Sequence, residues 1–322
     1  MFSFLLAALI ASSGAAWPQA YPAQPIKLVV PIAPGSVTDV ILRAVAQRLA
    51  PRLGQQVVIE NRAGGNFVIG AQACASAAPD GYTLCAVNNN SLSINPLIYD
   101  KLPYDADKDF VPVTNLYIVI ETLAASASLE AKTVAELREL ARAKPASLNF
   151  GTLGQGSYPD LYLAWLNNRW GSKIVGVPYR GGGPVAQALA SGEIQLANIG
   201  LGNILGLLPT GKIRLLTVST EQRLPSVPEV PTAREAGLGD FPDHVWWGLV
   251  APRGTPAPII DKLNREFVRL FQEPEFVAYL AGQAAVAAVG SPAEFTSFLM
   301  KDRSDTAALL SLANTPRLEY RD

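Results

Sequence analysis

The segment IKLVVPIAPGSVTDV, residues 26–40, decides the fold class. It begins with a nearly continuous apolar run from Ile26 to Val30, which is typical of a strand buried on both faces of a parallel sheet. A Pro-Gly-Ser turn ends this strand, and apolar residues then recur at helical spacing from Val37 to Leu53. Ser36 stands at the N-cap position, and Asp39 follows it as in a capping box. A buried strand that leads directly into such a helix predicts a βα unit.

The same alternation continues along the chain and starts again near residue 134, where Thr133 and Glu136 are spaced as a second capping box. Alternating strands and helices indicate βαβ units. We therefore expect an α/β, bilobed fold with two mostly parallel sheets flanked by helices and a cleft between the lobes. Further strands are expected at 56–60, 82–87, 147–150, 173–177, 194–199, 213–218 and 246–250, and further helices at 66–78, 134–143, 159–170, 185–190, 256–271, 274–282 and 292–312.

Two segments are expected to cross between the lobes, at residues 113–123 and 243–250. Residues 17–119 and 244–322 would then form lobe I, and residues 120–243 would form lobe II. The closing helices are expected to return to lobe I.

The composition supports a two-domain globular protein. The chain has 322 residues, of which 49% are hydrophobic and 16% charged, so it can bury a large core. With 26 basic and 27 acidic side chains, its formal net charge is -1. Because nucleic-acid binding needs a basic excess or stripe, no nucleic-acid partner is expected.

The N-terminus resembles a secretory signal peptide, which we place at residues 1–16. An apolar run from Phe2 to Ile10 is followed by small residues up to Ala16, and the run is too short to span a bilayer. No Lys or Arg precedes the run, and a buried N-terminal helix is the alternative. We expect an exported, soluble mature protein.

The chain has two cysteines, Cys74 and Cys85. They are expected on a helix and on the strand that follows it. An exported protein meets an oxidising compartment, which permits a disulfide, but two separate buried thiols are the favoured interpretation. Their spacing matches no zinc pattern, and we expect no metal site.

Two Gly/Ser-rich loops, residues 31–40 and 151–161, are the candidate ligand-binding segments. Each follows the first strand of its lobe and opens a helix, which is where open α/β sheets bind ligands and where free N–H groups favour anions. Two ordinary strand-to-helix turns are the alternative interpretation. Neither loop contains Lys or Arg, so a carboxylate would be held by neutral donors. Arg62 and Arg180 are the nearest cations, and we expect surface or structural roles for both.

The motifs of common enzymes are absent from the sequence, so we expect no catalytic residue and no cofactor. His244 is the only histidine, which excludes a metal site built on several histidines. Neither a G-x-S-x-G elbow nor a phosphate-binding loop occurs. Asp39 is a candidate general base, but capping is its favoured role. Trp246 and Trp247 are expected to pack at the hinge rather than line a ligand.

Several strings, taken in order, resemble the periplasmic solute-binding proteins of tripartite tricarboxylate transporters, the Bug or TctC family. The resemblance runs from residue 17 to residue 312. It implies a type II-like periplasmic-binding fold that closes on a small organic carboxylate by hinge motion. The strings are VVPIAPGSVTDV (29–40), IENRAGG (59–65), APDGYTL (78–84), INPLIYDKLPYD (94–105), DFVPV (109–113), VPYRGGGP (177–184), GKIRLLTVST (211–220), LPSVPEVPTAREAGL (224–238) and APRGTP (251–256).

The resemblance also implies the residues that contact the ligand. They come from the loop after the first strand, the end of a later lobe I strand, and the loops of lobe II. The set is Ala33, Pro34, Gly35, Ser36, Thr38, Asp39, Asn88, Asn89, Asn90, Gly154, Gln155, Gly156, Ser157, Tyr179, Gly181, Gly182, Gly183, Ile199, Gly200 and Asn203.

The chain departs from the family pattern at both sides of the expected cleft. The first loop reads PIAPGS where an aromatic residue and a further glycine are usual. Ile199 and Gly200 stand where many relatives carry an Asp-Asn pair. This makes the cleft less polar and favours a ligand with an apolar portion.

The expected function is therefore that of a non-catalytic periplasmic receptor, a monomer that delivers a carboxylate to the permease subunits of a tripartite tricarboxylate transporter. Two alternatives stay open. A signalling receptor would pass its closed form to a sensor kinase, and a periplasmic hydrolase or isomerase would use Asp39 or a cleft serine.

Overall fold

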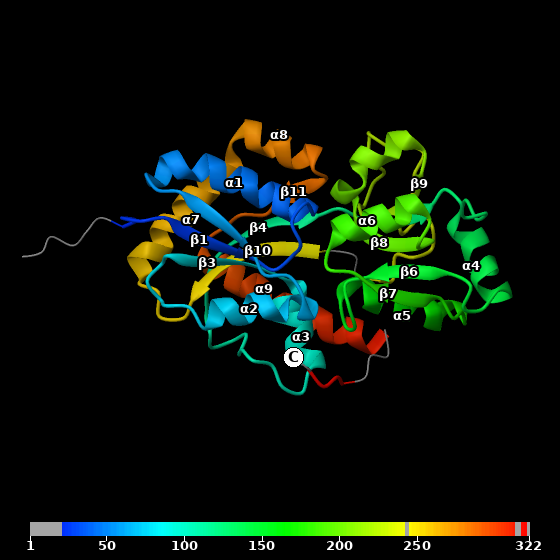
Figure 1. Ribbon diagram of the computed structural model, residues 1–322, viewed down its shortest axis with the longest axis horizontal. Helices are drawn as coiled ribbons and strands as arrows, with labels where there is room; N and C mark the ends of the chain where they lie inside the picture. Colours follow the sequence, from blue (N-terminus) through cyan, green and yellow to red (C-terminus); the bar gives the residue numbers. More distant parts are fainter. Residues whose placement is uncertain (1–20, 242–244, 313–316, 321–322) are drawn as a thin grey trace, which may run out of the picture.

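The computed structural model describes residues 21–241, 245–312 and 317–320, without the side chains of residues 309 and 312. The protein consists of two α/β lobes that lie side by side, each a sheet between two layers of helices (Figure 1). The predicted fold class and its bilobed arrangement are confirmed. The signal peptide expected at residues 1–16 and the start of the second expected crossing, including His244, lie outside the described residues.

Lobe I is built on a six-stranded sheet with the strand order β11-β4-β10-β3-β1-β2. Strands β1 and β2 and strands β1 and β3 pair in parallel, whereas the pairs made by β10, β4 and β11 are antiparallel. The strands are β1 (Ile26–Val30), β2 (Val57–Asn61), β3 (Thr83–Asn88), β4 (Phe110–Val119), β10 (Val245–Pro252) and β11 (Ala285–Ala287). The helices are α1 (Val37–Leu53), α2 (Val68–Ala75), α3 (Asn95–Ile98), α7 (Ala257–Gln272), α8 (Pro274–Gly282) and α9 (Pro292–Leu312), with shorter turns at Gly65–Phe67 and Asn90–Ile94.

Lobe II is built on a five-stranded sheet with the strand order β7-β6-β8-β5-β9. Its strands are β5 (Glu121–Ser126), β6 (Asn149–Thr152), β7 (Val175–Pro178), β8 (Leu196–Gly200) and β9 (Ile213–Val218). Its helices are α4 (Val134–Ala143), α5 (Tyr158–Trp170) and α6 (Gly182–Ser191), with 3-10 turns at Leu201–Asn203 and Leu205–Thr210. Sheet membership changes between β4 and β5, within the first expected crossing, and again between β9 and β10.

The sheets are more mixed than expected. The parallel strands are those that carry the Gly/Ser loops, β1 with its neighbours and β6 with its neighbours. The antiparallel pairs are made by β4, β10 and β11 in lobe I and by β5 with β8 and β9 in lobe II, and β5 and β10 are the first strands after the chain passes between the lobes. The prediction of mostly parallel sheets is therefore right for the strands that precede the loops and wrong for the rest.

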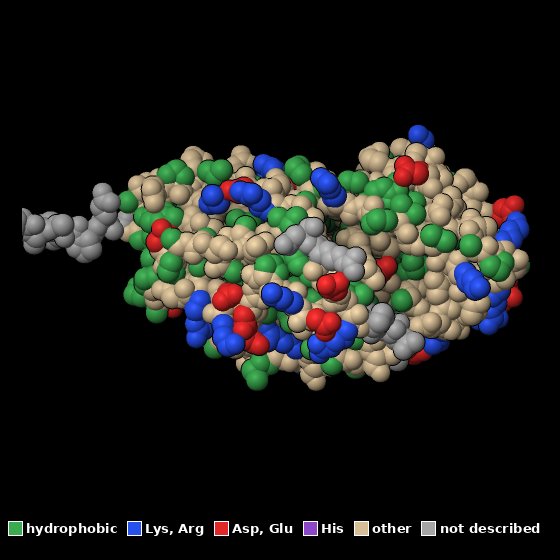
Figure 2. Space-filling view, turned by 60° about the horizontal axis from the view of Figure 1, so that its bottom comes forward, with side chains coloured by type: hydrophobic (Ala, Val, Ile, Leu, Met, Phe, Trp, Pro, Cys, Tyr) green, Lys and Arg blue, Asp and Glu red, His purple; other side chains and the backbone are tan. Residues whose placement is uncertain are grey.

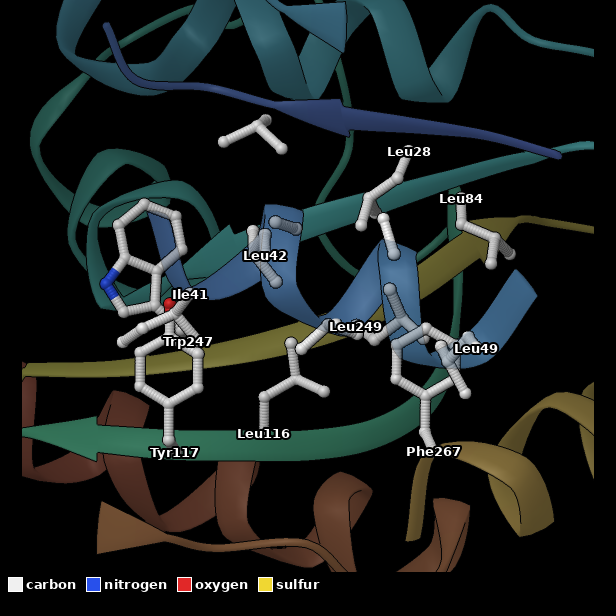
Figure 3. Close-up of a cluster of buried hydrophobic side chains, with 14 of the residues drawn as sticks. Leu28, Ile41, Leu42, Leu49, Leu84, Leu116, Tyr117, Trp247, Leu249 and Phe267 are labelled. Atoms are coloured by element: carbon white, nitrogen blue, oxygen red, sulfur yellow. The ribbon is translucent and has the colours of Figure 1, made fainter. Parts of the chain in front are cut away.

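Helix α1 shows how local sequence and core packing agree. Ser36 is its N-cap residue, and Gly54 ends it with φ 72° and an N–H bond to the carbonyl of Ala50 at 3.0 Å. Ile41, Leu42, Val45 and Leu49 are spaced to form one face, and all four are fully buried. That face packs on the lobe I sheet together with residues of β10, β4 and α7 (Figure 3). The side chains drawn include Leu28, Leu84, Leu116, Leu249 and Phe267.

Helix α9 covers the opposite face of the lobe I sheet and extends beneath lobe II (Figure 1). Near its start, Phe295 packs edge-to-face on Trp246, and near its end Leu310 packs against the lobe II core. The closing helices thus return to lobe I, as expected. None of the helices in the described part of the chain is long and apolar enough to cross a membrane.

The expectation of two separate thiols is wrong. Cys74 at the end of α2 and Cys85 in β3 form a disulfide, with Cα atoms 6.0 Å apart. Helix α2 packs directly against β3, which brings the two positions within the reach of a disulfide. Sequence spacing alone does not reveal that distance.

Candidate ligand-binding site

A small cavity of about 70 Å³ lies between the lobes, where strands end and helices begin. Both sheets and both Gly/Ser loops contribute to its wall. The wall includes no Lys or Arg among the described residues, and its one carboxyl group belongs to Glu121. It is formed by Ile32, Ser36, Val37, Thr38, Phe67, Asn88, Asn90, Val119, Glu121, Gly151, Leu153, Tyr158, Pro159, Gly182, Val185, Asn198, Ile199, Gly200, Asn203, Val245 and Trp247.

Three helices begin at this cavity. The first residues of α1, α5 and α6, which are Val37, Tyr158 and Gly182, all lie in the wall. The N-terminus of a helix carries partial positive charge and unpaired N–H groups. Their convergence brings partial positive charge to a cavity whose described wall has no basic side chain and one carboxyl group, that of Glu121.

The loop before α1 is fixed by Asp39. Its carboxylate accepts from the Gly35 N–H at 3.0 Å, the Arg43 Nε at 2.9 Å and the Asn61 Nδ2 at 2.8 Å. Burial by itself would raise the pKa of Asp39, but these hydrogen bonds and the Arg43 charge together hold that pKa below its usual value. Asp39 holds the turn, which agrees with the capping role and leaves the general-base role without support.

The loop before α5 repeats this turn in lobe II. Asp160 accepts from the Gly156 N–H at 2.8 Å, as Asp39 does from Gly35. Burial raises the pKa of Asp160, and the bond from Gly156 offsets only part of the rise. Asp160 was absent from the predicted site, although the repeated string G-S-x-x-D, at 35–39 and 156–160, marks it.

The hydroxyls of the two N-cap serines accept hydrogen bonds from a turn and from the opposite lobe rather than from their own helices. The Ser157 Oγ accepts from the Leu153 N–H at 3.2 Å, and the Ser36 Oγ accepts from the Gly183 N–H of the opposite lobe at 3.4 Å. Neither hydroxyl caps its own helix. Ser36 is therefore at the predicted N-cap position but does not make the predicted capping bond.

Each lobe instead caps the other with an asparagine. The Val37 N–H of α1 donates to the Asn203 Oδ1 of lobe II at 2.9 Å. The Tyr158 N–H of α5 donates to the Asn90 Oδ1 of lobe I at 3.3 Å, and the Asn90 Nδ2 donates to the Gly156 carbonyl at 3.2 Å. These reciprocal bonds join the lobes beside the cavity.

A larger, open depression of about 870 Å³ lies at the mouth of the cleft. Tyr99, Tyr179 and Tyr320 contribute to its wall, and Arg180 is its one Lys or Arg among the described residues. Arg62 lies outside this wall and pairs with Glu60. On the face shown in Figure 2, basic and acidic side chains are interspersed, so neither sign dominates that face.

The predicted site residues fall into three groups. The first group lies in the wall of the small interlobe cavity: Ser36, Thr38, Asn88, Asn90, Gly182, Ile199, Gly200 and Asn203. The second lies at the open mouth: Gly154, Gln155, Tyr179 and Gly181. The third lies in neither wall: Ala33, Pro34, Gly35, Asp39, Asn89, Gly156, Ser157 and Gly183.

The predicted site omitted more than half of the residues in the cavity wall, among them Asn198, Glu121 and Trp247. Asn198 is 4% exposed and lies in β8, where its signal is a single polar residue within the apolar strand LANIG. Glu121 is buried at the start of β5. Trp247 packs in the lobe I core, as expected, but also lines the cavity. Within the described residues, no group of three or more His, Cys, Asp or Glu side chains is placed to hold a metal ion.

Comparison with known proteins identifies the relatives of this chain. A family model described as the tripartite tricarboxylate transporter family receptor matches residues 41–310. The chain is 35% identical over 308 residues to a UPF0065 protein of Bordetella bronchiseptica, an alignment that covers 95% of this chain and 90% of that protein. It is 33% identical over 294 residues to protein BugT of Bordetella pertussis, with 90% of each chain covered.

Solved structures agree in fold. Rpa4515 of R. palustris with adipate has a TM-score of 0.88 and 32% identity, covering 92% of this chain and 100% of that one. MatC of Rhodopseudomonas palustris with bound malate has a TM-score of 0.85 and 32% identity, covering 90% of this chain and 100% of that one. The predicted resemblance is confirmed, and the chain belongs to the tripartite tricarboxylate transporter receptor family of solute-binding proteins.

Proposed function

We propose that this protein is a periplasmic receptor that binds a small organic carboxylate in the interlobe cavity and delivers it to a tripartite tricarboxylate-type membrane transporter. It would act as a monomer and leave the ligand chemically unchanged. Family membership supports this role, as do the relatives whose structures contain adipate and malate.

The observation that carries the proposal is the meeting of α1, α5 and α6 at one cavity between the lobes. Burying an anion away from water is costly unless donors replace its hydration. Helix N-termini contribute partial positive charge in fixed positions, and the asparagines of the wall add neutral amides. A carboxylate therefore suits the cavity without a basic partner in the described wall. The Val37, Tyr158 and Gly183 N–H groups are themselves bound to Asn203, Asn90 and Ser36 in this structure, so a ligand would have to replace these bonds to use them.

The size of the cavity favours a small ligand. Its 70 Å³ is well below the roughly 300–1,000 Å³ typical of pockets for drug-sized molecules. Because the asparagine bonds join the two lobes beside the cavity, we expect them to open when a ligand enters. A bound carboxylate that contacts both lobes would then favour the closed form by its differential affinity for that form.

A thermal-shift screen of mono-, di- and tricarboxylates against their neutral methyl esters tests the binding step. We expect at least one carboxylate to raise the melting temperature, because a ligand that binds only the folded state stabilises it by mass action. Calorimetry should then give one site per chain, and mass spectrometry should recover the ligand unchanged. Stabilisation by esters but by no carboxylate, or conversion of the ligand to a product, would contradict the proposal.

A pair of glycine variants tests the location. In Gly182→Val the new side chain enters the cavity wall, since a Cβ there would lie 2.6 Å from the Asn203 Oδ1. We expect the affinity for the carboxylate to fall by about tenfold or more, which is about 1.4 kcal/mol. Gly206→Val is the matched control, because a Cβ at Gly206 meets no atom within 4 Å. Equal affinity in both folded variants would place the ligand elsewhere.

Delivery needs a separate test, since binding alone does not identify the partner. Uptake of the identified carboxylate by membrane vesicles that contain the permease should require the purified receptor. Uptake that is equally fast without the receptor would remove the transport part of the proposal.

A further inference from the structure

The side chain of Asn198 is the unusual polar group of the cavity. It lies in β8, opposite Leu123 of β5. Alternation along the strand puts Leu196 and Asn198 on one face, and Leu196 packs into the core that includes α5. Asn198 therefore sits below the start of α5, next to the cavity that Tyr158 and Pro159 also line.

Asparagines line the cavity from both lobes, and Asn198 differs from the others. The Asn88 Oδ1 accepts from the N–H and the hydroxyl of Ser91, both at 3.0 Å. Asn90 and Asn203 form the cross-lobe bonds described above. Asn198 is only 4% exposed, and neither its Oδ1 nor its Nδ2 has a hydrogen-bond partner among the described residues.

An unpaired buried amide is costly, and Asn198 carries both a donor and an acceptor. A plain carboxylate provides acceptors only, so it would satisfy the Nδ2 and leave the Oδ1 facing another oxygen. A hydroxyl or a carboxamide on the ligand provides a donor as well. Because neither amide atom is bound to any residue that the structure describes, the side chain can present either edge to such a group.

We propose that Asn198 is a specificity-determining residue, which selects carboxylates that carry a hydroxyl or carboxamide group over plain carboxylates. This inference rests on the proposed function and names the ligand class of the same cavity. Likeness to relatives does not decide the matter, because the two at 32% identity contain adipate, which has no hydroxyl, and malate, which has one.

The test uses pairs of acids that differ by a single hydroxyl: succinate with malate, propionate with lactate, and glutarate with 2-hydroxyglutarate. Calorimetry on the full protein should show that the hydroxylated member of at least one pair binds about tenfold or more tightly. In Asn198→Leu, which removes both polar atoms, that preference should fall to within about threefold. Asn198→Ala should give the same result with a smaller side chain, and Asn149→Leu, which changes the same residue type in neighbouring β6 outside both cavity walls, should keep the wild-type preference.

The outcomes separate this inference from the function on which it rests. If plain and hydroxylated acids bind equally, or if Asn198→Leu keeps the preference, Asn198 serves only the fold or a bound water and the inference is wrong. In that case the carboxylate receptor still stands. If neither the six acids nor any carboxylate of the wider screen binds, both proposals fail.

Discussion

The segments Gly35–Asp39 and Gly156–Asp160 have the same pattern, G-S-x-x-D, and form the same turn in different lobes. Both glycines have positive φ, 81° and 74°, and both aspartates accept from the glycine N–H four residues earlier. The pKa of Asp39 is nevertheless lowered and that of Asp160 raised. Arg43 and Asn61 contact the first carboxylate, and no such pair is recorded at the second within the described residues. The local sequence sets the turn, whereas the neighbours set its electrostatics.

The largest expected difference concerns the glycines themselves. An L-residue in the left-handed region destabilises the fold by about 1–2 kcal/mol. Gly35→Ala should lower the free energy of unfolding by this amount alone, because a Cβ there meets nothing within 4 Å. Gly156→Ala should lower the free energy of unfolding by about 3 kcal/mol, because its Cβ would also lie 2.3 Å from the Ile98 Cδ1. Urea denaturation measures both. Equal losses would mean that Ile98 moves aside and that the two turns tolerate substitution alike.

The positive φ values also limit what glycine variants reveal about binding. Valine at either position would strain the backbone, so weaker binding would not separate contact with the ligand from damage to the fold. Gly182→Val avoids this backbone strain, because its backbone lies outside the left-handed region, but its side chain also displaces Asn203 from the Val37 N–H.

The second-largest expected difference comes from the disulfide, which lies in lobe I. Replacing Cys74 and Cys85 together with alanine should cost about 2–3 kcal/mol, the amount expected for a short closed loop. Hydrogen exchange should become faster in β1 and β3 of lobe I while β6 and β8 of lobe II stay protected, since local stability differs between cooperative units. Equal loss of protection in both sheets would show that the lobes unfold as one unit.

Replacing the two aspartates should change the free energy of unfolding by a smaller amount than replacing the cysteines. At pH 7 we expect Asp39→Asn to cost about 1–2 kcal/mol, because the buried carboxylate loses its charge-assisted bond with Arg43. Asp160→Asn should change stability by less than about 1 kcal/mol, and upward, because the amide still accepts from Gly156 without a buried charge. The midpoints of urea denaturation measure both changes, provided that the dependence of the unfolding free energy on urea concentration is unchanged. A larger loss for Asp160→Asn would mean that its charge is favourable in the fold.

The smallest effect is the pH dependence, and its sign is opposite at the two sites. The lowered pKa of Asp39 adds stability above the ordinary value of 3.8, which is lost as pH falls through the folded-state pKa. The raised pKa of Asp160 favours the folded state below 3.8, and that contribution is lost as pH rises through the folded-state pKa. Carboxyl carbon NMR should therefore show Asp39 titrating below Asp160. The reverse order would contradict the comparison.

The sequence by itself determined the elements that depend on local patterns. Helix 134–143 and strand 213–218 have the predicted bounds, because apolar periodicity, caps and breakers act within a few residues. In α4 the predicted capping bond is present, with the Thr133 Oγ1 accepting from the Glu136 N–H at 3.2 Å. The family strings likewise indicated the bilobed class before any contact between distant residues was known.

Only the tertiary structure decided which distant residues meet. The Cys74–Cys85 bond, the antiparallel strands, the mutual capping by Asn90 and Asn203, and the unpaired amide of Asn198 all depend on packing between separate elements. The contrast between Asp39 and Asp160 has the same origin, because identical strings acquire different neighbours when each lobe folds. Local sequence determines which conformation a segment adopts, but the environment of a side chain depends on residues that the chain brings together from far apart.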